Sequence, residues 1–170
     1  MLFRSDTEKR ASRIAVIRTL LDAGARSIDT APSYGPAEAT LGDLLAEMKA
    51  RDRVFISTKF RAPGREGAIA EMKESLRRLR TDKVELMLRH NIGFVPQTEV
   101  AEHLAVLRDW KAQGICRYIG VTHSQDQDKA NPRLIDMLQK EKLDFIQVNY
   151  SLAERSVEDK LLAVAAGTGT

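Results

Sequence analysis

Apolar residues recur along the chain with two alternating patterns. Ile14, Ile17 and Leu21 follow the spacing of one helical face, and Gly24 is a residue that favours the end of a helix. Residues 26–29, with the sequence RSID, then form a short segment that predicts a strand. The chain therefore begins with a helix that leads directly into a strand.

The same alternation continues to the end of the chain. Strands are predicted at residues 53–59, 84–90, 117–122 and 143–150. The helices between them are predicted from the apolar positions Leu41, Leu44, Leu45, Ile69, Met72, Leu76, Leu79, Val100, Leu104 and Leu107. Asn131 and Pro132 resemble an N-cap followed by proline at the first helical position, so a helix is expected to begin there. Ser156 and Asp159 resemble a capping box, so the last helix is expected to begin at Ser156.

Strands that alternate with helices predict parallel β-α-β units with right-handed crossovers. Such units build either an open doubly wound sheet or a (β/α)8 barrel. Polar residues fall at or near the ends of successive strands, and they are Asp29, Lys59, His90, Thr122 and Gln147. In a barrel these ends converge on one mouth, where barrel enzymes keep their chemistry. The sequence has no G-x-G-x-x-G or Walker glycine loop, which favours the barrel over a nucleotide-binding open sheet.

Composition narrows the function classes. A chain of 170 residues with 43% hydrophobic content predicts one domain over residues 1–170. It has no apolar run of about 20 residues and no signal-peptide core at its start, so we expect a cytoplasmic protein without membrane contact. The net charge of +3 is spread over helices that also carry acids, so no nucleic-acid partner is expected. Cys116 is the only cysteine, which excludes an internal disulfide and indicates a core residue.

The strand-end residues suggest acid catalysis. Each of them alone could be a solvated side chain or a turn residue, but together they predict a partly dry site in which charges need partners. A phenol has an ordinary pKa of about 10, and an adjacent ammonium stabilises its phenolate. The pattern places Lys59 beside Tyr34, with Asp29 holding the lysine charge and His90 orienting a substrate oxygen. This set suits protonation of a carbonyl oxygen while a nicotinamide cofactor supplies hydride.

Five segments, GARSIDTAPSYG, FISTK, LRRLRTDKVELMLRHN, GICRYIGVTHS and FIQVNYSL, resemble the signatures of the aldo-keto reductases in order and spacing. The resemblance covers about residues 12–165 and points to a bacterial branch of that family. It implies a (β/α)8 fold, a small carbonyl substrate, NADPH as cofactor with NADH as an alternative, and a catalytic tetrad. The tetrad residues would be Asp29, Tyr34, Lys59 and His90. The residues that hold the nicotinamide carboxamide would be Gln147, Thr122 and His123, the last standing where many members have asparagine.

The resemblance also implies that the barrel is incomplete. The five predicted strands correspond to barrel strands 2 to 6, so the first strand is missing ahead of residue 12 and strands seven and eight after residue 165. We therefore expect a truncated chain with little or no activity of its own. Its open strand edges and exposed interior would favour self-association. A non-catalytic interaction module remains the alternative, although the intact tetrad argues against it. His103 is expected to be structural or solvent-facing, and Trp110 to pack its helix on the barrel.

Overall fold

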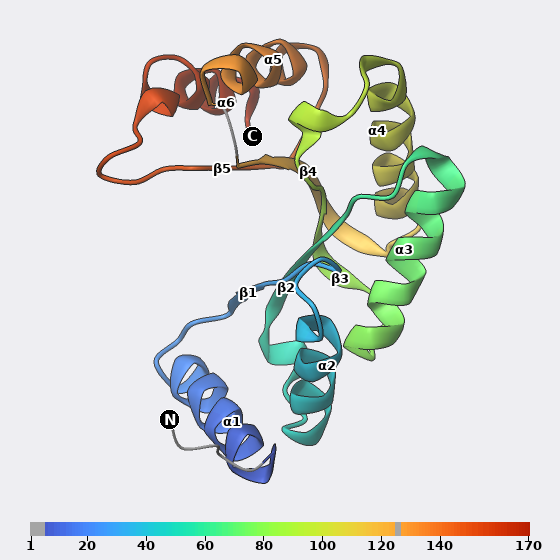
Figure 1. The fold of residues 1–170 in the computed structure, drawn as a ribbon, viewed down its shortest axis with the longest axis vertical. Coiled ribbons are helices and arrows are strands. Elements are labelled where there is room, and N and C mark those ends of the chain that lie inside the picture. Colours follow the sequence, from blue (N-terminus) through green and yellow to red (C-terminus); the bar gives the residue numbers. More distant parts are fainter. Residues whose placement is uncertain (1–5, 125–126) are drawn as a thin grey trace.

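A computed structural model describes residues 6–124 and 127–170, with the side chains of residues 9–124 and 131–170 (Figure 1). It contains one parallel sheet of five strands in the order β1-β2-β3-β4-β5. The strands are β1 (Ser27–Asp29), β2 (Phe55–Phe60), β3 (Val84–Arg89), β4 (Cys116–His123) and β5 (Phe145–Val148). The sheet is curled, so the predicted incomplete (β/α)8 barrel with five parallel strands is confirmed.

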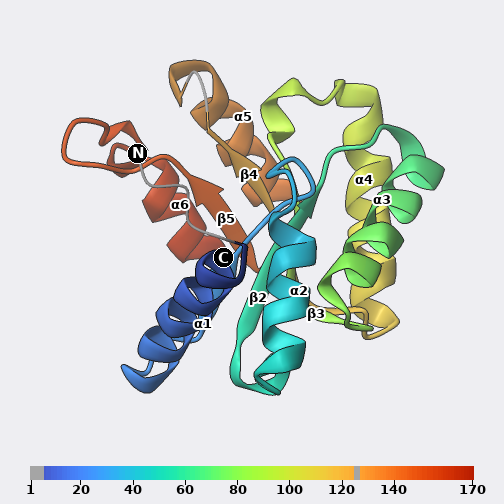
Figure 2. The same cartoon turned by 60° about the horizontal axis from the view of Figure 1, so that its bottom comes forward.

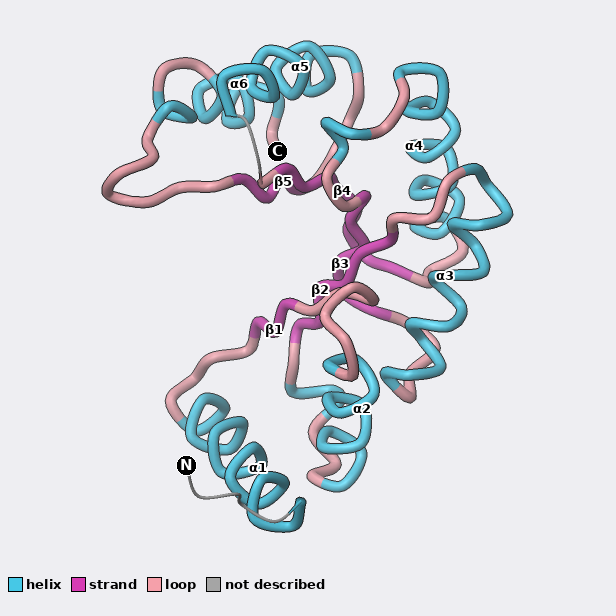
Figure 3. Tube along the Cα trace, viewed as in Figure 1, coloured by secondary structure: helices cyan, strands magenta, loops and turns pink. Residues whose placement is uncertain are grey.

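Helices connect the strands and lie on the convex side of the sheet, as the cyan and magenta segments of Figure 3 show. The α-helices are α1 (Asp6–Asp22), α2 (Ala37–Glu47), α3 (Gly64–Leu79), α4 (Gln97–Ala112), α5 (Gln127–Lys140) and α6 (Leu161–Thr168). Three short 3-10 helices are η1 (Arg51–Arg53), η2 (Ile92–Phe94) and η3 (Ser156–Glu158). Figure 2 shows α2, α3 and α4 side by side along the sheet. None of the helices within the described residues is long and apolar enough to cross a membrane.

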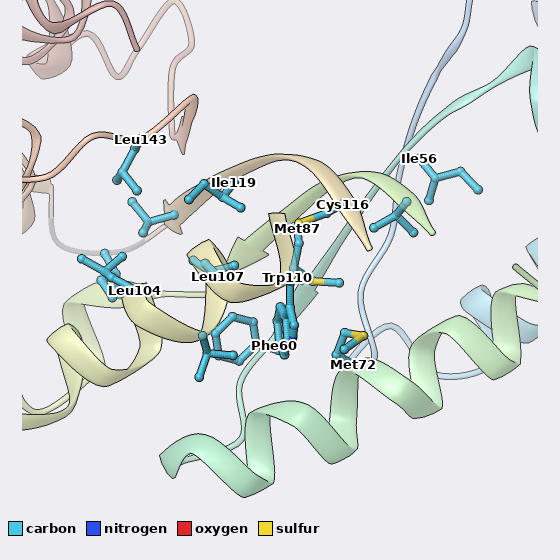
Figure 4. Packing of buried hydrophobic residues seen from close by; sticks show 14 of the residues in the cluster. Ile56, Phe60, Met72, Met87, Leu104, Leu107, Trp110, Cys116, Ile119 and Leu143 are labelled. Carbon is cyan, nitrogen blue, oxygen red and sulfur yellow. The ribbon is translucent and has the colours of Figure 1, made fainter. Parts of the chain in front are cut away.

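The hydrophobic core lies between the sheet and these helices (Figure 4). Trp110 of α4 is only 3% exposed and meets the ring of Phe60 edge to face, with 5.3 Å between the ring centroids. Trp110 therefore packs its helix onto the sheet, as predicted. Cys116 is also buried in this core, and burial raises the pKa of its thiol to about 12, which makes the thiol unreactive at neutral pH.

The predicted start of the fifth α-helix was wrong. Helix α5 begins at Gln127 and continues through Pro132, so Asn131 is not its N-cap. A proline inside a helix removes one backbone hydrogen bond, which is the reason for expecting a start there. Buried Leu134, Met137 and Leu138 pack this helix onto the core, and tertiary packing of this kind outweighs a local propensity.

The predicted capping box was also wrong. Ser156 opens the short helix η3, and α6 begins only at Leu161. The Ser156 hydroxyl donates to the carboxylate of Glu154 at 2.7 Å and makes no capping bond to a backbone N–H group. The backbone N–H of Ser156 also donates to this carboxylate at 3.3 Å, so Glu154 accepts from both donors of the serine.

Candidate active site

The carboxyl ends of all five strands meet at one edge of the curled sheet. Asp29 is the last residue of β1, Lys59 lies near the end of β2, and His90 directly follows β3. Thr122 of β4 and Gln147 of β5 are partners in the strand register. Parallel pairing therefore brings the polar strand ends predicted from the sequence to the same edge of the sheet.

Lys59 is the most buried member of the group, with 1% of its side chain exposed. Its ammonium donates to Asp29 Oδ2 at 2.6 Å and to the backbone carbonyl oxygen of Thr30 at 2.9 Å. A buried ammonium needs such partners because desolvation of an unpaired charge is costly. The Asp29 side chain is 37% exposed, so the pair joins a buried ammonium to a carboxylate that solvent can reach.

Tyr34 lies in the loop after β1 and is 46% exposed. Its ring centroid is 5.0 Å from Lys59 Nζ, a distance at which an ammonium interacts favourably with an aromatic ring. The His90 ring stands perpendicular to it, with 6.2 Å between the centroids. The phenol is thus placed beside both an ammonium and an imidazole.

His90 is half-buried, and its backbone N–H donates to the carbonyl oxygen of Phe60 at 3.0 Å. Burial lowers the pKa of His90, and the positive charges of Lys59 and Arg61 lower it further. The imidazole is therefore neutral at pH 7. Its Nδ1 atom is buried and has no hydrogen-bond partner among the described residues, so one ring nitrogen is left without a protein ligand.

The three residues expected to bind cofactor do not share one environment. Gln147 Nε2 donates to Asp29 Oδ1 at 3.3 Å, which links β5 to β1. Thr122 Oγ1 accepts a hydrogen bond from the Asn91 backbone N–H at 3.0 Å. The next residue, His123, points to the other side of the sheet because side chains alternate along a strand. Its buried ring packs on Phe94, and its Nδ1 accepts from the Gly93 N–H at 3.3 Å.

Two polar residues beside the site were not predicted to belong to it. Arg89, the last residue of β3, is buried and hydrogen-bonds to His103 of α4. His103 is fully buried, so of its two predicted environments the structural one is correct. The only sequence signal was an arginine that ends the otherwise apolar stretch LMLR. Within the described residues no group of three histidine, cysteine or acidic side chains is placed to hold a metal ion.

A curled parallel sheet thus carries a lysine–aspartate pair, a tyrosine and a histidine at its carboxyl edge. The chain belongs to the aldo/keto reductase family, whose model matches residues 2–170. The resemblance found in the sequence is thereby confirmed.

Individual relatives agree with this assignment. The chain is 34% identical over 172 residues to the aldo-keto reductase YhdN of Bacillus subtilis, covering 94% of this chain and 49% of YhdN. It is 30% identical over 179 residues to an NADH-specific methylglyoxal reductase of Escherichia coli, covering 90% of this chain and 53% of that protein. The chain thus spans about half the length of these curated relatives.

Solved structures show the same fold. An aldo/keto reductase from Klebsiella pneumoniae in complex with NADP and acetate superposes with a TM-score of 0.78 and 29% identity, covering 95% of this chain and 56% of that one. The holo form of the aldo-keto reductase AKR11C1 from Bacillus halodurans gives a TM-score of 0.81 at 22% identity, with 95% and 55% covered. Both likenesses extend over nearly all of this chain.

Proposed function

We propose that this chain carries the catalytic residues of an NAD(P)H-dependent reductase of small carbonyl compounds. The observation that supports this best is the buried Lys59 ammonium, which is paired with Asp29 and lies 5.0 Å from the Tyr34 ring centroid. One relative is named as a methylglyoxal reductase, and for that reason we propose small aldehydes and dicarbonyls as the substrates. In this proposal residues 1–170 form a single partial barrel domain.

In this proposal each tetrad residue has one role. Tyr34 donates its proton to the carbonyl oxygen, and Lys59 stabilises the phenolate that remains. Asp29 holds the lysine charge in place. Neutral His90 hydrogen-bonds to the same carbonyl oxygen and orients it. The cofactor supplies the hydride that reaches the carbonyl carbon, so the product is an alcohol.

The residues at the ends of β4 and β5 fit the nicotinamide end of such a cofactor. The exposed amide of Gln147 offers both a donor and an acceptor, as a carboxamide requires. The Thr122 oxygen accepts from Asn91, which leaves its own hydrogen available for donation. His123 would have to leave its contact with η2 to join them. NADPH is the proposed cofactor, because a similar solved structure holds NADPH. NADH is the alternative, because another relative is named as NADH-specific.

The decisive experiment compares Tyr34→Phe with the unaltered chain and with Tyr150→Phe. Tyr150 is a matched control because it is an exposed tyrosine like Tyr34 and its hydroxyl donates to Glu158. Reduction of methylglyoxal by NADPH is followed by absorbance, and cofactor binding is followed by fluorescence titration. Loss of a general acid should reduce kcat by about a hundredfold or more in Tyr34→Phe, with unchanged cofactor affinity.

Two results would contradict the proposal. Equal rates in Tyr34→Phe and in the unaltered chain would exclude Tyr34 as the acid. Neither turnover nor cofactor binding in the unaltered chain would favour the non-catalytic interaction module instead.

A further inference from the structure

Arg89 occupies an unusual place directly behind the candidate site. It ends β3, is only 7% exposed, and projects towards α4 on the helix side of the sheet. Its guanidinium carbon lies 5.4 Å from the centroid of the Phe60 ring. Burial lowers the pKa of Arg89 from its ordinary value, and Glu71 and Glu99 oppose this at longer range. Among the described residues Arg89 forms no ion pair with a carboxylate, so its donors are directed elsewhere.

Those donors form hydrogen bonds to the main chain at His90 and Phe60. Arg89 Nη1 donates to the carbonyl oxygen of His90 at 2.5 Å and to that of Phe60 at 3.2 Å. The Phe60 carbonyl oxygen also accepts the backbone N–H of His90. The main chain of His90 is therefore fixed at its N–H through Phe60 and at its carbonyl group through Arg89. The same Phe60 follows Lys59 in β2, so one guanidinium ties together the strand ends that carry two tetrad residues.

His103 holds the guanidinium from the other side. Its Nδ1 accepts the Arg89 Nε–H at 3.1 Å, which requires a neutral ring with its proton on Nε2. Burial and then the positive charge of Arg89 lower the pKa of His103, in agreement with that state. The His103 ring also packs edge to face on Phe60, with 5.6 Å between centroids. The imidazole thus acts as a fixed acceptor that aims the guanidinium at the two carbonyl groups.

We propose that Arg89, oriented by His103, is a positioning residue for His90. It does not touch substrate, and it acts by holding the His90 main chain where the ring faces Tyr34. This inference rests on the proposed function, because positioning matters to catalysis only if His90 orients the carbonyl. Burying a guanidinium is costly unless its donors are satisfied. Here those donors fix the main chain of His90, a residue whose position would matter for catalysis.

The first test measures kcat and cofactor affinity separately in Arg89→Met and Arg89→Lys, with Arg77→Met as control. Arg77 is an exposed arginine of α3 that pairs with Glu74. A displacement of His90 of about 1 Å should reduce kcat by about ten- to a hundredfold in Arg89→Met, with cofactor Kd unchanged. The lysine variant keeps the charge but not the planar fork, so it should remain impaired. Cofactor affinity that falls in step with kcat would indicate general destabilisation and overturn the proposal.

The second test separates the effect on kcat of the hydrogen bond at residue 103 from the effect of its packing. His103→Asn retains an acceptor near the position of Nδ1, whereas His103→Leu fills the space without one. The asparagine variant should keep more of the kcat than the leucine variant. Better activity in the leucine variant would show that residue 103 serves only to pack the core.

The third test does not depend on turnover, and it separates failure of this inference from failure of the proposed function. The chain has three histidines, so side-chain nitrogen NMR spectra can be assigned from single substitutions. His103 should be neutral with its proton on Nε2, and Arg89→Lys should shift the His90 ring resonances while leaving those of His123 in place. Unchanged His90 resonances would overturn the inference even in a chain that reduces carbonyls. Shifted resonances in an inactive chain would support the inference and count only against the proposed activity.

Discussion

The centre of the sheet and its two edges are built differently. Strands β2, β3 and β4 have six to eight residues, and most of their side chains are buried. The edge strands β1 and β5 have only three and four residues, and these alternate between exposed and half-buried. The central strands are covered by α2, α3 and α4, whereas each edge strand has a partner on one side only.

The candidate site is divided along the same line. Lys59 and His90 come from the central strands, where packing and hydrogen bonds fix them. Asp29, Tyr34 and Gln147 come from the edges and are at least one-third exposed or lie in exposed segments. The centre therefore sets the geometry of the site, and the edges present the groups that a ligand can reach. Substitutions in the two regions should consequently affect different properties.

The largest expected difference is in stability. Trp110→Ala removes a buried ring from the covered side of the central strands and should lower the free energy of unfolding by about 3–5 kcal/mol. Phe145→Ala removes a ring of β5 that is 38% exposed, and should cost about 1 kcal/mol. Guanidinium denaturation followed by circular dichroism measures both values. Equal losses would mean that the edge strands are packed as firmly as the centre.

A smaller effect is expected from a buried carboxylate on the central side. Glu38 of α2 is 1% exposed, accepts from the Thr58 hydroxyl at 2.7 Å and pairs with Arg78 at 2.8 Å. Glu38→Gln should lower the free energy of unfolding by about 2 kcal/mol, since a charged partner is lost inside the protein. Glu74→Gln is the control, because Glu74 is 41% exposed and pairs with exposed Arg77 and, at 3.3 Å, with the same Arg78, so its loss should be barely detectable. A similar cost for both variants would contradict this view.

The smallest effect is a dependence of stability on pH. The folded chain lowers the pKa of His90 and of His103 mainly by burial, so the unfolded chain takes up protons first as the pH falls. The free energy of unfolding should be constant with respect to these groups above the ordinary histidine pKa of about 6.5 and should fall below it. His103→Asn should flatten this decline in denaturation experiments at several pH values. An unaltered slope would assign the decline to other groups.

Much of this arrangement could be predicted from the sequence. The alternation of apolar strands and amphipathic helices is repeated often enough to indicate parallel units, and polar residues such as Asp29 and Lys59 stand out at strand ends. Their meeting in space follows from the fold alone, because parallel strands share one carboxyl edge. The starts of α5 and α6 could not be predicted in this way, since α5 continues through Pro132, and Ser156 donates to Glu154 instead of capping a helix.

Buried polar pairs were also beyond the reach of sequence patterns. Glu38, Arg89 and His103 each lie in or at the end of an element that also carries buried apolar residues, and a pattern alone assigns such polar residues to the surface or to function. Their environment depends on partners that come from other elements, at separations of 14 to 40 residues in the sequence. Only the folded arrangement identifies which polar groups satisfy one another.

The strand order has a consequence for synthesis. Each strand of the sheet pairs with the strand that precedes it in the chain, so every pairing can form as soon as the next strand leaves the ribosome. One described contact at the site does not follow this rule. The hydrogen bond between Gln147 and Asp29 joins residues that are 118 positions apart and needs both edge strands. During translation the centre of the candidate site can therefore be complete before its two edges are brought together.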